Sequence, residues 1–230
     1  MKKSSLASIL VVVVVLPLTL ILGTKLPGRW YYLTATLVVI ESMLPFFFYF
    51  EGRRPQAREL VILAVMAAIA AVSRVAFSFI PHFKPITAIV MITGIAFGAQ
   101  AGFLTGAISA FASNFFFSQG AWTPWQMMAY GVGGFLAGML FHRESEYRKP
   151  FYITVFGFLS VVLIIGPILD CCTIFTILTK ITAQSTLLVF AQGIPANLFH
   201  AISCAVTLAL VCKPLMQKLD RLKNKYGILK

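Results

Sequence analysis

Long apolar runs separated by short polar segments set the pattern of this sequence. Most runs approach the ~20 residues that a helix needs to cross a bilayer. Every Lys and Arg except Arg74 lies outside them. The pattern therefore predicts an all-α, polytopic membrane helix bundle. The runs are Leu6–Thr24, Trp30–Phe50, Leu60–Ile80, Ile86–Ser118, Trp125–Phe141, Phe151–Leu169 and Ser185–Val211.

The run from Ile86 to Ser118 is too long for one crossing. Its 33 residues contain no charge and no proline, and a single helix would extend ~50 Å against a hydrocarbon core of ~30 Å. A break near Gly98 to Gly102 gives two short helices, eight spans in all, and both termini on one side. The short helices are then expected to be enclosed by the others.

The basic residues favour this topology and set its orientation. With eight spans and cytoplasmic termini, 14 Lys and Arg face the cytoplasm and four face outward, whereas a seven-span topology gives six and 12. The positive-inside rule favours the first arrangement. The inner set is Lys2, Lys3, Arg53, Arg54, Arg58, Arg143, Arg148, Lys149, Lys213, Lys218, Arg221, Lys223, Lys225 and Lys230. The sequence thus predicts a multi-pass protein of the cell membrane.

Composition agrees with a membrane location. The 230 residues are 59% hydrophobic and 11% charged, whereas soluble domains carry roughly 25% charged residues. The net charge of +12 is explained by cytoplasmic loops, so we expect no nucleic-acid partner. The polar linker 51–59 divides a two-helix extension, residues 1–52, from a six-helix core with a basic cytoplasmic tail, residues 53–230.

Several kinds of chemistry are missing from the sequence. There is no phosphate-binding Gly-x-x-x-x-Gly-Lys-Ser/Thr motif, and residues 60–143 contain no Asp or Glu. Only Glu41 and Asp170 place a carboxylate within or beside a span, which is a poor set for ion coupling or acid–base catalysis. The four cysteines lack zinc spacing. We therefore expect no enzyme activity, no metal site and no cofactor of its own.

Small residues recur at helical spacing in two regions. Gly94, Gly98, Gly102 and Gly106 are four residues apart, and Gly134 and Gly138 repeat this spacing. Such residues let helix backbones approach closely, either inside the bundle or at another membrane subunit. The alanine-rich third span offers a second flat face, and its candidate docking residues are Ala64, Ala67, Ala68 and Ala71.

Polar and aromatic residues gather at the predicted outer end. Polar groups inside a membrane need partners, water or a ligand, so a ligand cavity is predicted there. Arg74 either contacts the ligand, extends outward to water, or pairs with Asp170; His82 is not expected to bind a metal. The candidate substrate-binding residues are Arg74, His82, Phe83, Lys84, Asn114, Trp122, Thr123, Trp125, Gln126, Tyr130, Asp170, Gln192 and Asn197.

These segments together resemble a known family. The motifs are Ala64-Val-Met-Ala-Ala68, Thr93-Gly-Ile-Ala-Phe-Gly98, Ser113-Asn114, Thr123-Pro-Trp-Gln-Met127 and Gly193-Ile-Pro-Ala-Asn197. Their order over about Leu60 to Val211 resembles the S component, the substrate-binding membrane subunit, of an energy-coupling factor (ECF) transporter. Residues 6–50 depart from the six-helix plan of that family by adding two helices.

The resemblance implies a division of labour. An S component binds a vitamin from outside, and a membrane coupling protein (T component) with two cytoplasmic ATPases supplies the energy. The alanine-rich helix contacts the coupling protein, and the bundle tilts in the bilayer to deliver its ligand. The resemblance also implies that the segments His82–Lys84, Trp122–Gln126 and Asp170–Gln184 gate the pocket.

The sequence leaves the ligand and two other functions open. It looks most like the cobalamin-type members, although riboflavin, queuosine precursors and other vitamins remain alternatives. A stand-alone secondary carrier coupled through Asp170 or Glu41 is the second hypothesis. A membrane-bound enzyme acting on a lipid or prenyl substrate is the third.

Overall fold

The computed structural model describes residues 3–25, 30–52, 56–142 and 149–226. Helices and short turns account for all of the described chain, and no strand occurs within it. The all-α expectation is therefore confirmed.

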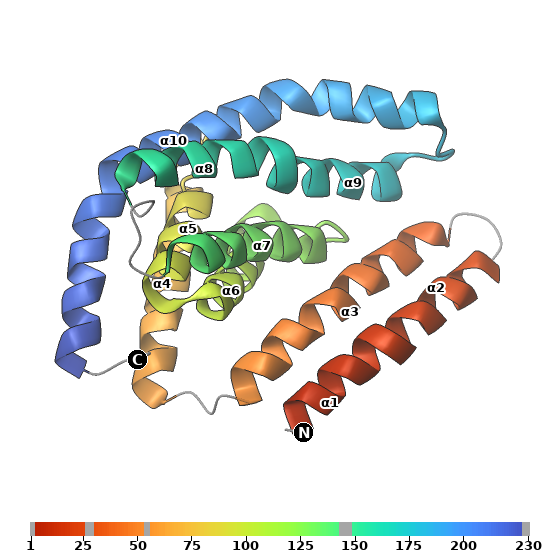
Figure 1. Cartoon of the computed structure of the whole chain (residues 1–230). Helices are drawn as coiled ribbons and strands as arrows, with labels where there is room; N and C mark the ends of the chain where they lie inside the picture. Colours follow the sequence, from red (N-terminus) through yellow and green to blue (C-terminus); the bar gives the residue numbers. More distant parts are fainter. Residues whose placement is uncertain (1–2, 26–29, 53–55, 143–148, 227–230) are drawn as a thin grey trace.

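The N-terminal extension is an antiparallel helix pair (Figure 1). Its first arm comprises α1 (Lys3–Leu10), the π-helical turn η1 (Val11–Val15) and α2 (Leu16–Lys25), and its second arm is α3 (Tyr31–Gly52). The first arm packs on α3, and α3 packs on the core helices α6, α7 and α9. Phe46 of α3 stacks on Phe103 of α6 with ring centroids 3.9 Å apart. Aromatic packing thus joins the extension to the core.

The core begins with α4 and ends with one very long helix. Its elements are α4 (Ala57–Ala76), α5 (Ile86–Phe97), α6 (Ala99–Phe117), α7 (Thr123–Phe141), α8 (Pro150–Ser160), the π-helical turn η2 (Val161–Ile165), α9 (Gly166–Ile177) and α10 (Ala183–Tyr226). The helices α8, η2 and α9 form one continuous rod beside α10 (Figure 1).

The apolar run 86–118 divides at Gly98, as the sequence predicts. Gly98 has φ +96°, a conformation that glycine adopts without steric cost. All 12 residues of α5 are buried, so this helix is enclosed by its neighbours. Five described segments are long and apolar enough to cross a membrane, namely 6–23, 31–52, 57–76, 150–177 and 183–225. The other three predicted spans correspond to α5, α6 and α7.

The glycine spacing serves packing inside the core. A Cβ atom added to Gly94 would lie 2.1 Å from the backbone oxygen of Gly134, and one added to Gly102 would lie 2.4 Å from the same oxygen. A Cβ atom on Gly138 would meet the backbone of Ala99 at 2.6 Å. The backbones of α5, α6 and α7 therefore touch directly, and these glycines are not an outward docking surface.

Three predicted helix ends are wrong. The span expected to end at Ile80 stops at Ala76, and residues 77–80 form turns. The span expected to finish at Leu169 continues to Ile177, because no glycine or proline interrupts the sequence between these residues. The last span, expected to end at Val211, continues to Tyr226. Pro214 lies inside it, and the buried Met216 and Leu219 hold the segment beyond the proline against the core. A packed helix kinks at proline rather than ending there, and Figure 1 shows α10 changing direction in its final part.

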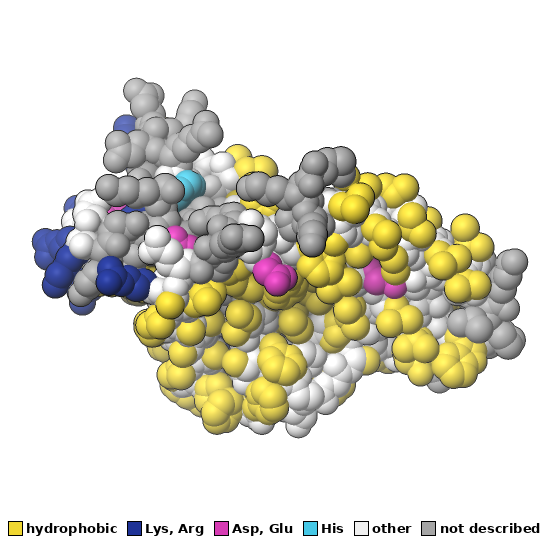
Figure 2. Space-filling view, turned by 90° about the horizontal axis from the view of Figure 1, so that it is seen from below, with side chains coloured by type: hydrophobic (Ala, Val, Ile, Leu, Met, Phe, Trp, Pro, Cys, Tyr) yellow, Lys and Arg dark blue, Asp and Glu magenta, His cyan; other side chains and the backbone are white. Residues whose placement is uncertain are grey.

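Charge is concentrated at one end of the molecule. Figure 2 shows Lys and Arg side chains gathered at the left end, whereas hydrophobic side chains cover most of the rest of this face. Exposed basic residues of the last part of α10 are Lys213, Lys218, Arg221 and Lys225. This end is called the basic end below.

Candidate functional site

A buried arginine joins the last turn of α4, at the end away from the basic end, to α6. Arg74 is only 7% exposed. Its Nη1 donates to Ser113 Oγ at 2.6 Å and to Asn114 Oδ1 at 2.8 Å, both on α6. The guanidinium carbon lies 4.7 Å from the centre of the Phe117 ring. Arg74 bonds to α6 and Asp170 bonds to Asn197, so the structure does not contain the Arg74–Asp170 pair that was one of the three alternatives for Arg74.

The same network continues into the start of α7. Asn114 Nδ2 donates to Thr123 Oγ1 at 3.0 Å, and Thr123 Oγ1 donates to Gln119 Oε1 at 2.9 Å. The backbone N–H of Gly120 also donates to Thr123 Oγ1, at 3.2 Å. The hydroxyl therefore fixes the turn between α6 and α7. This positions the first residues of α7 relative to Arg74.

Three polar side chains on the first two turns of α7 have a buried polar atom without a hydrogen-bond partner. These atoms are Trp125 Nε1, Gln126 Oε1 and Tyr130 OH. Buried polar atoms nearly always have a partner, so such a group indicates water or a ligand. We call these three residues the α7 cluster. All three belong to the predicted binding set.

Aromatic and polar groups from α5, α9 and α10 surround the α7 cluster. The Trp125 ring stacks on Phe175 of α9 with centroids 5.7 Å apart and an interplanar angle of 19°. The Tyr130 ring lies edge-on to His200 of α10 at 6.0 Å. His200 Nε2 is in turn hydrogen-bonded to Thr87 Oγ1 of α5 at 2.7 Å. Four helices thus contribute side chains to one region.

Asp170 and Asn197 join α9 to α10 in a tight contact. Asn197 Nδ2 donates to Asp170 Oδ2 at 2.8 Å. A Cβ atom on Gly193 would lie 2.5 Å from Asp170 Oδ1, and one on Gly166 would lie 2.5 Å from Asn197 Cγ. The two glycines therefore make room for the pair. Asp170 lies inside α9, so the predicted gating segment 170–184 is helical up to Ile177.

A comparison with known protein families identifies the family of this helix bundle. Residues 55–219 match the family model described as ECF-type riboflavin transporter, S component. The chain belongs to this family. Comparisons with curated proteins and with solved structures found no match. The match leaves the two-helix extension outside it.

Membership identifies the chain as an S component, the substrate-binding subunit of an ECF transporter, and as a multi-pass membrane protein. It is a transporter subunit and not an enzyme. S components of this kind work with a T component and ATPases. The matched family is the riboflavin type, so the match lends no support to the cobalamin-type expectation. No group of three or more metal-ligating side chains occurs in the described segments.

The remaining predicted site residues of the S component are more exposed. His82 is exposed with φ +60°, whereas Phe83 and Lys84 are half-buried. Trp122 and Gln192 are exposed. Phe83 packs against Phe77, with ring centroids 5.3 Å apart. These residues lie at the same end as Arg74 but take no part in the hydrogen bonds of the buried network.

Sequence reasoning missed four contributors to the site, namely Ser113, Thr87, Phe175 and His200. Ser113 belonged to a family motif, and His200 was a polar residue within an apolar run, so both carried a usable signal. Nothing in the sequence distinguishes Phe175 from the other phenylalanines, of which the chain has 21 in all. Only the packing of α9 against α7 selects it.

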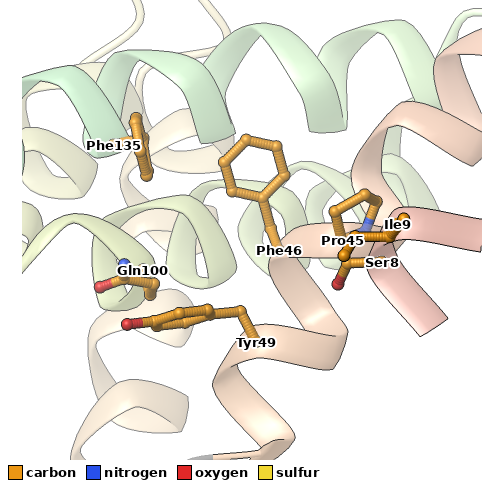
Figure 3. Close-up of a pocket in the computed structure, with 7 residues that line it drawn as sticks. All are labelled: Ser8, Ile9, Pro45, Phe46, Tyr49, Gln100 and Phe135. Atoms are coloured by element: carbon orange, nitrogen blue, oxygen red, sulfur yellow. The ribbon is translucent and has the colours of Figure 1, made fainter. Parts of the chain in front are cut away.

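A cavity of about 410 Å³ lies away from this region. Figure 3 shows that it is formed between the extension and the core, with Phe46 and Tyr49 of α3 facing Gln100 and Phe135. Gln100 and Phe135 lie toward the ends of α6 and α7 opposite to Asn114 and Trp125. Its lining is mainly apolar and carries no charged side chain, so it does not match the predicted binding set. The lining residues are Ser8, Ile9, Pro45, Phe46, Tyr49, Gln100 and Phe135.

The four candidate docking alanines of α4 point in two directions. Ala64 and Ala68 are exposed, beside the exposed Val61, Val65 and Val72. Ala67 and Ala71 are buried against the core. The outward face of α4 therefore contains only the first pair.

Proposed function

We propose that this S component binds a vitamin with a flat heteroaromatic ring at the α7 cluster. The observation that carries the proposal is the set of three buried polar atoms without partners beside a stacked Trp125–Phe175 pair. The indole N–H donates, the amide oxygen accepts, and the phenol does either. A ring that bears both N–H and carbonyl groups along one edge, as a flavin does, suits this combination.

The riboflavin-type family match supports the same ligand class. Riboflavin is therefore the first candidate, and the larger cobalamin, favoured by the sequence alone, is the second. Ligand would enter from the outside, past the segment that contains His82 and Lys84. This orientation follows from the basic end, which the positive-inside rule assigns to the cytoplasm.

Delivery would require partners. We propose that the exposed face of α4, with Ala64 and Ala68, docks on the T component. Small side chains allow close approach between membrane helices. Two ATPases would then supply the energy for transport from the cytoplasmic side.

Direct binding tests the ligand assignment. Purified full-length chain in detergent is expected to quench riboflavin fluorescence saturably and without ATP. Its melting temperature is expected to rise with riboflavin concentration, because the ligand binds only the folded state. Cobalamin and thiamin serve as comparison ligands in the same melting assay. Stabilisation by cobalamin and not by riboflavin would replace the first candidate with the second.

The variant Tyr130→Phe separates ligand binding from stability. The Tyr130 hydroxyl is fully buried and has no partner in the described chain, so its removal is expected to leave the melting temperature of the ligand-free protein unchanged or higher. Riboflavin affinity is expected to fall about tenfold, as for the loss of one hydrogen bond to a ligand. Unchanged affinity in a fluorescence titration would remove Tyr130 from the site.

A further inference from the structure

The charge of Arg74 has no negative partner in the described chain. Its two hydrogen-bond acceptors, Ser113 Oγ and Asn114 Oδ1, are both neutral, and its ring neighbour Phe117 is uncharged. Residues 60–143 contain no Asp or Glu at all. A cation that is only 7% exposed and lacks a counter-ion is costly. The position therefore calls for an anion that the described residues do not supply.

The guanidinium also keeps a free edge. Nη1 is the one nitrogen that donates to a described residue. Nε and Nη2 donate to none, and neither atom is fully buried. These two nitrogens therefore border space that protein atoms do not close. An arginine holds carboxylate and phosphate through such a pair of N–H groups.

Further basic groups lie around the same space. Lys84, Arg74 and His82 each act electrostatically on His200, and no carboxylate of the described chain acts on it alongside them. His200 in turn contacts Tyr130 of the α7 cluster. Asp170 is bonded to Asn197. Arg74, Lys84 and His82 thus lie within electrostatic range of His200, which borders Tyr130 of the α7 cluster.

We infer that the ligand of this S component carries an anionic group, a carboxylate or a phosphate, which binds Arg74 beside Lys84 while its ring lies at the α7 cluster. The inference rests on the proposed site at the α7 cluster, but it favours an anionic ligand with the same kind of ring, such as riboflavin 5′-phosphate, over uncharged riboflavin. A neutral ligand would leave the Arg74 charge uncompensated in the bound state.

Riboflavin and riboflavin 5′-phosphate form a matched pair for the test, since they differ only in the phosphate at one end. With purified full-length chain, fluorescence titration at physiological ionic strength is expected to give at least about tenfold tighter binding for the phosphate. Arg74→Gln is expected to bring the ratio of the two dissociation constants close to one.

Lys84→Gln provides a second variant, because a half-buried lysine at the end of a loop is less critical to folding than Arg74. It is expected to lower the phosphate preference by about threefold. Lys213→Gln, an exposed lysine at the basic end of α10, is the control and should change nothing. If Arg74→Gln does not fold, the inference is tested by the ratio of the two flavin dissociation constants measured for Lys84→Gln.

The outcomes separate the two proposals. Riboflavin that binds as tightly as its phosphate, or more tightly, overturns the anionic group and leaves the proposed function intact. If neither flavin binds, the flavin assignment fails, and a melting screen compares biotin, folate and pantothenate with cobalamin and thiamin. Stabilisation by an anionic vitamin then supports the inference. Stabilisation by the neutral or cationic ones alone, or by none, contradicts it.

Discussion

Replacing Gly94 by alanine is expected to destabilise this S component severely. The new Cβ atom would lie 2.1 Å from the backbone oxygen of Gly134 and 3.1 Å from the backbone nitrogen of Gly138. Backbone atoms of a packed helix cannot rotate away, so α5 and α7 must separate. Overpacking of this kind costs roughly 3 kcal/mol or more, which corresponds to a melting temperature lower by about 10 °C.

Gly157→Ala is the matched control. Its Cβ atom would meet the Leu208 Cδ1 atom at 2.2 Å, which is the far end of a flexible side chain, and Cys204 Sγ at 3.3 Å. Leucine can adopt another rotamer, and alanine favours a helix over glycine by up to about 1 kcal/mol. Thermal unfolding of both variants in detergent measures the contrast. Equal melting temperatures for the two would contradict direct backbone contact between α5 and α7.

Enlarging the exposed face of α4 is expected to stop uptake while ligand binding continues. Ala64→Leu combined with Ala68→Leu adds bulk where we place the T component, and bulk prevents the close approach of helices. Vitamin uptake by cells that co-express the T component and ATPases should fall to background. Riboflavin binding by the purified variant should stay within about twofold of the original affinity, because both alanines face away from the α7 cluster.

Ala191→Leu is the control for this experiment, since Ala191 is likewise an exposed alanine, on α10. Normal uptake by the double α4 variant would remove the docking assignment. Uptake by the chain alone, without its partners and sensitive to an uncoupler, would instead favour a stand-alone carrier. Under that hypothesis the candidate coupling groups are Asp170, bonded to Asn197, and Glu41, which accepts a hydrogen bond from Thr19 at 2.6 Å.

Local sequence signals predicted the main features of the fold. The length of the run from 86 to 118 required a break, and the break falls at Gly98, whose positive φ favours glycine. The continuation of α9 to Ile177 and of α10 to Tyr226 was not predictable in the same way. A carboxylate or a proline usually ends an apolar helix, and here packing against neighbouring helices keeps both helices intact.

The candidate site was predicted in part. Arg74, Asn114 and Tyr130 were selected as polar residues within apolar runs, because intramembrane polar groups are costly and therefore informative. Thr123 was selected from the segment between two runs. The hydrogen-bond partners of these residues could not be predicted from the sequence. The sequence left a ligand, water or Asp170 as partners for Arg74, and only the packing of α4 on α6 placed Asn114 Oδ1 2.8 Å from Arg74 Nη1.

The length of α10 links the two ends of the protein mechanically. His200 contacts Tyr130 of the α7 cluster, and Lys223 of the same helix donates to the Ala96 backbone oxygen at the end of α5. These points are separated by 23 residues of one helix, which changes direction in its final part. A movement of α10 at the ligand region would reach the basic end only through this bend. One continuous helix thus joins the proposed ligand region to the basic end without an intervening loop.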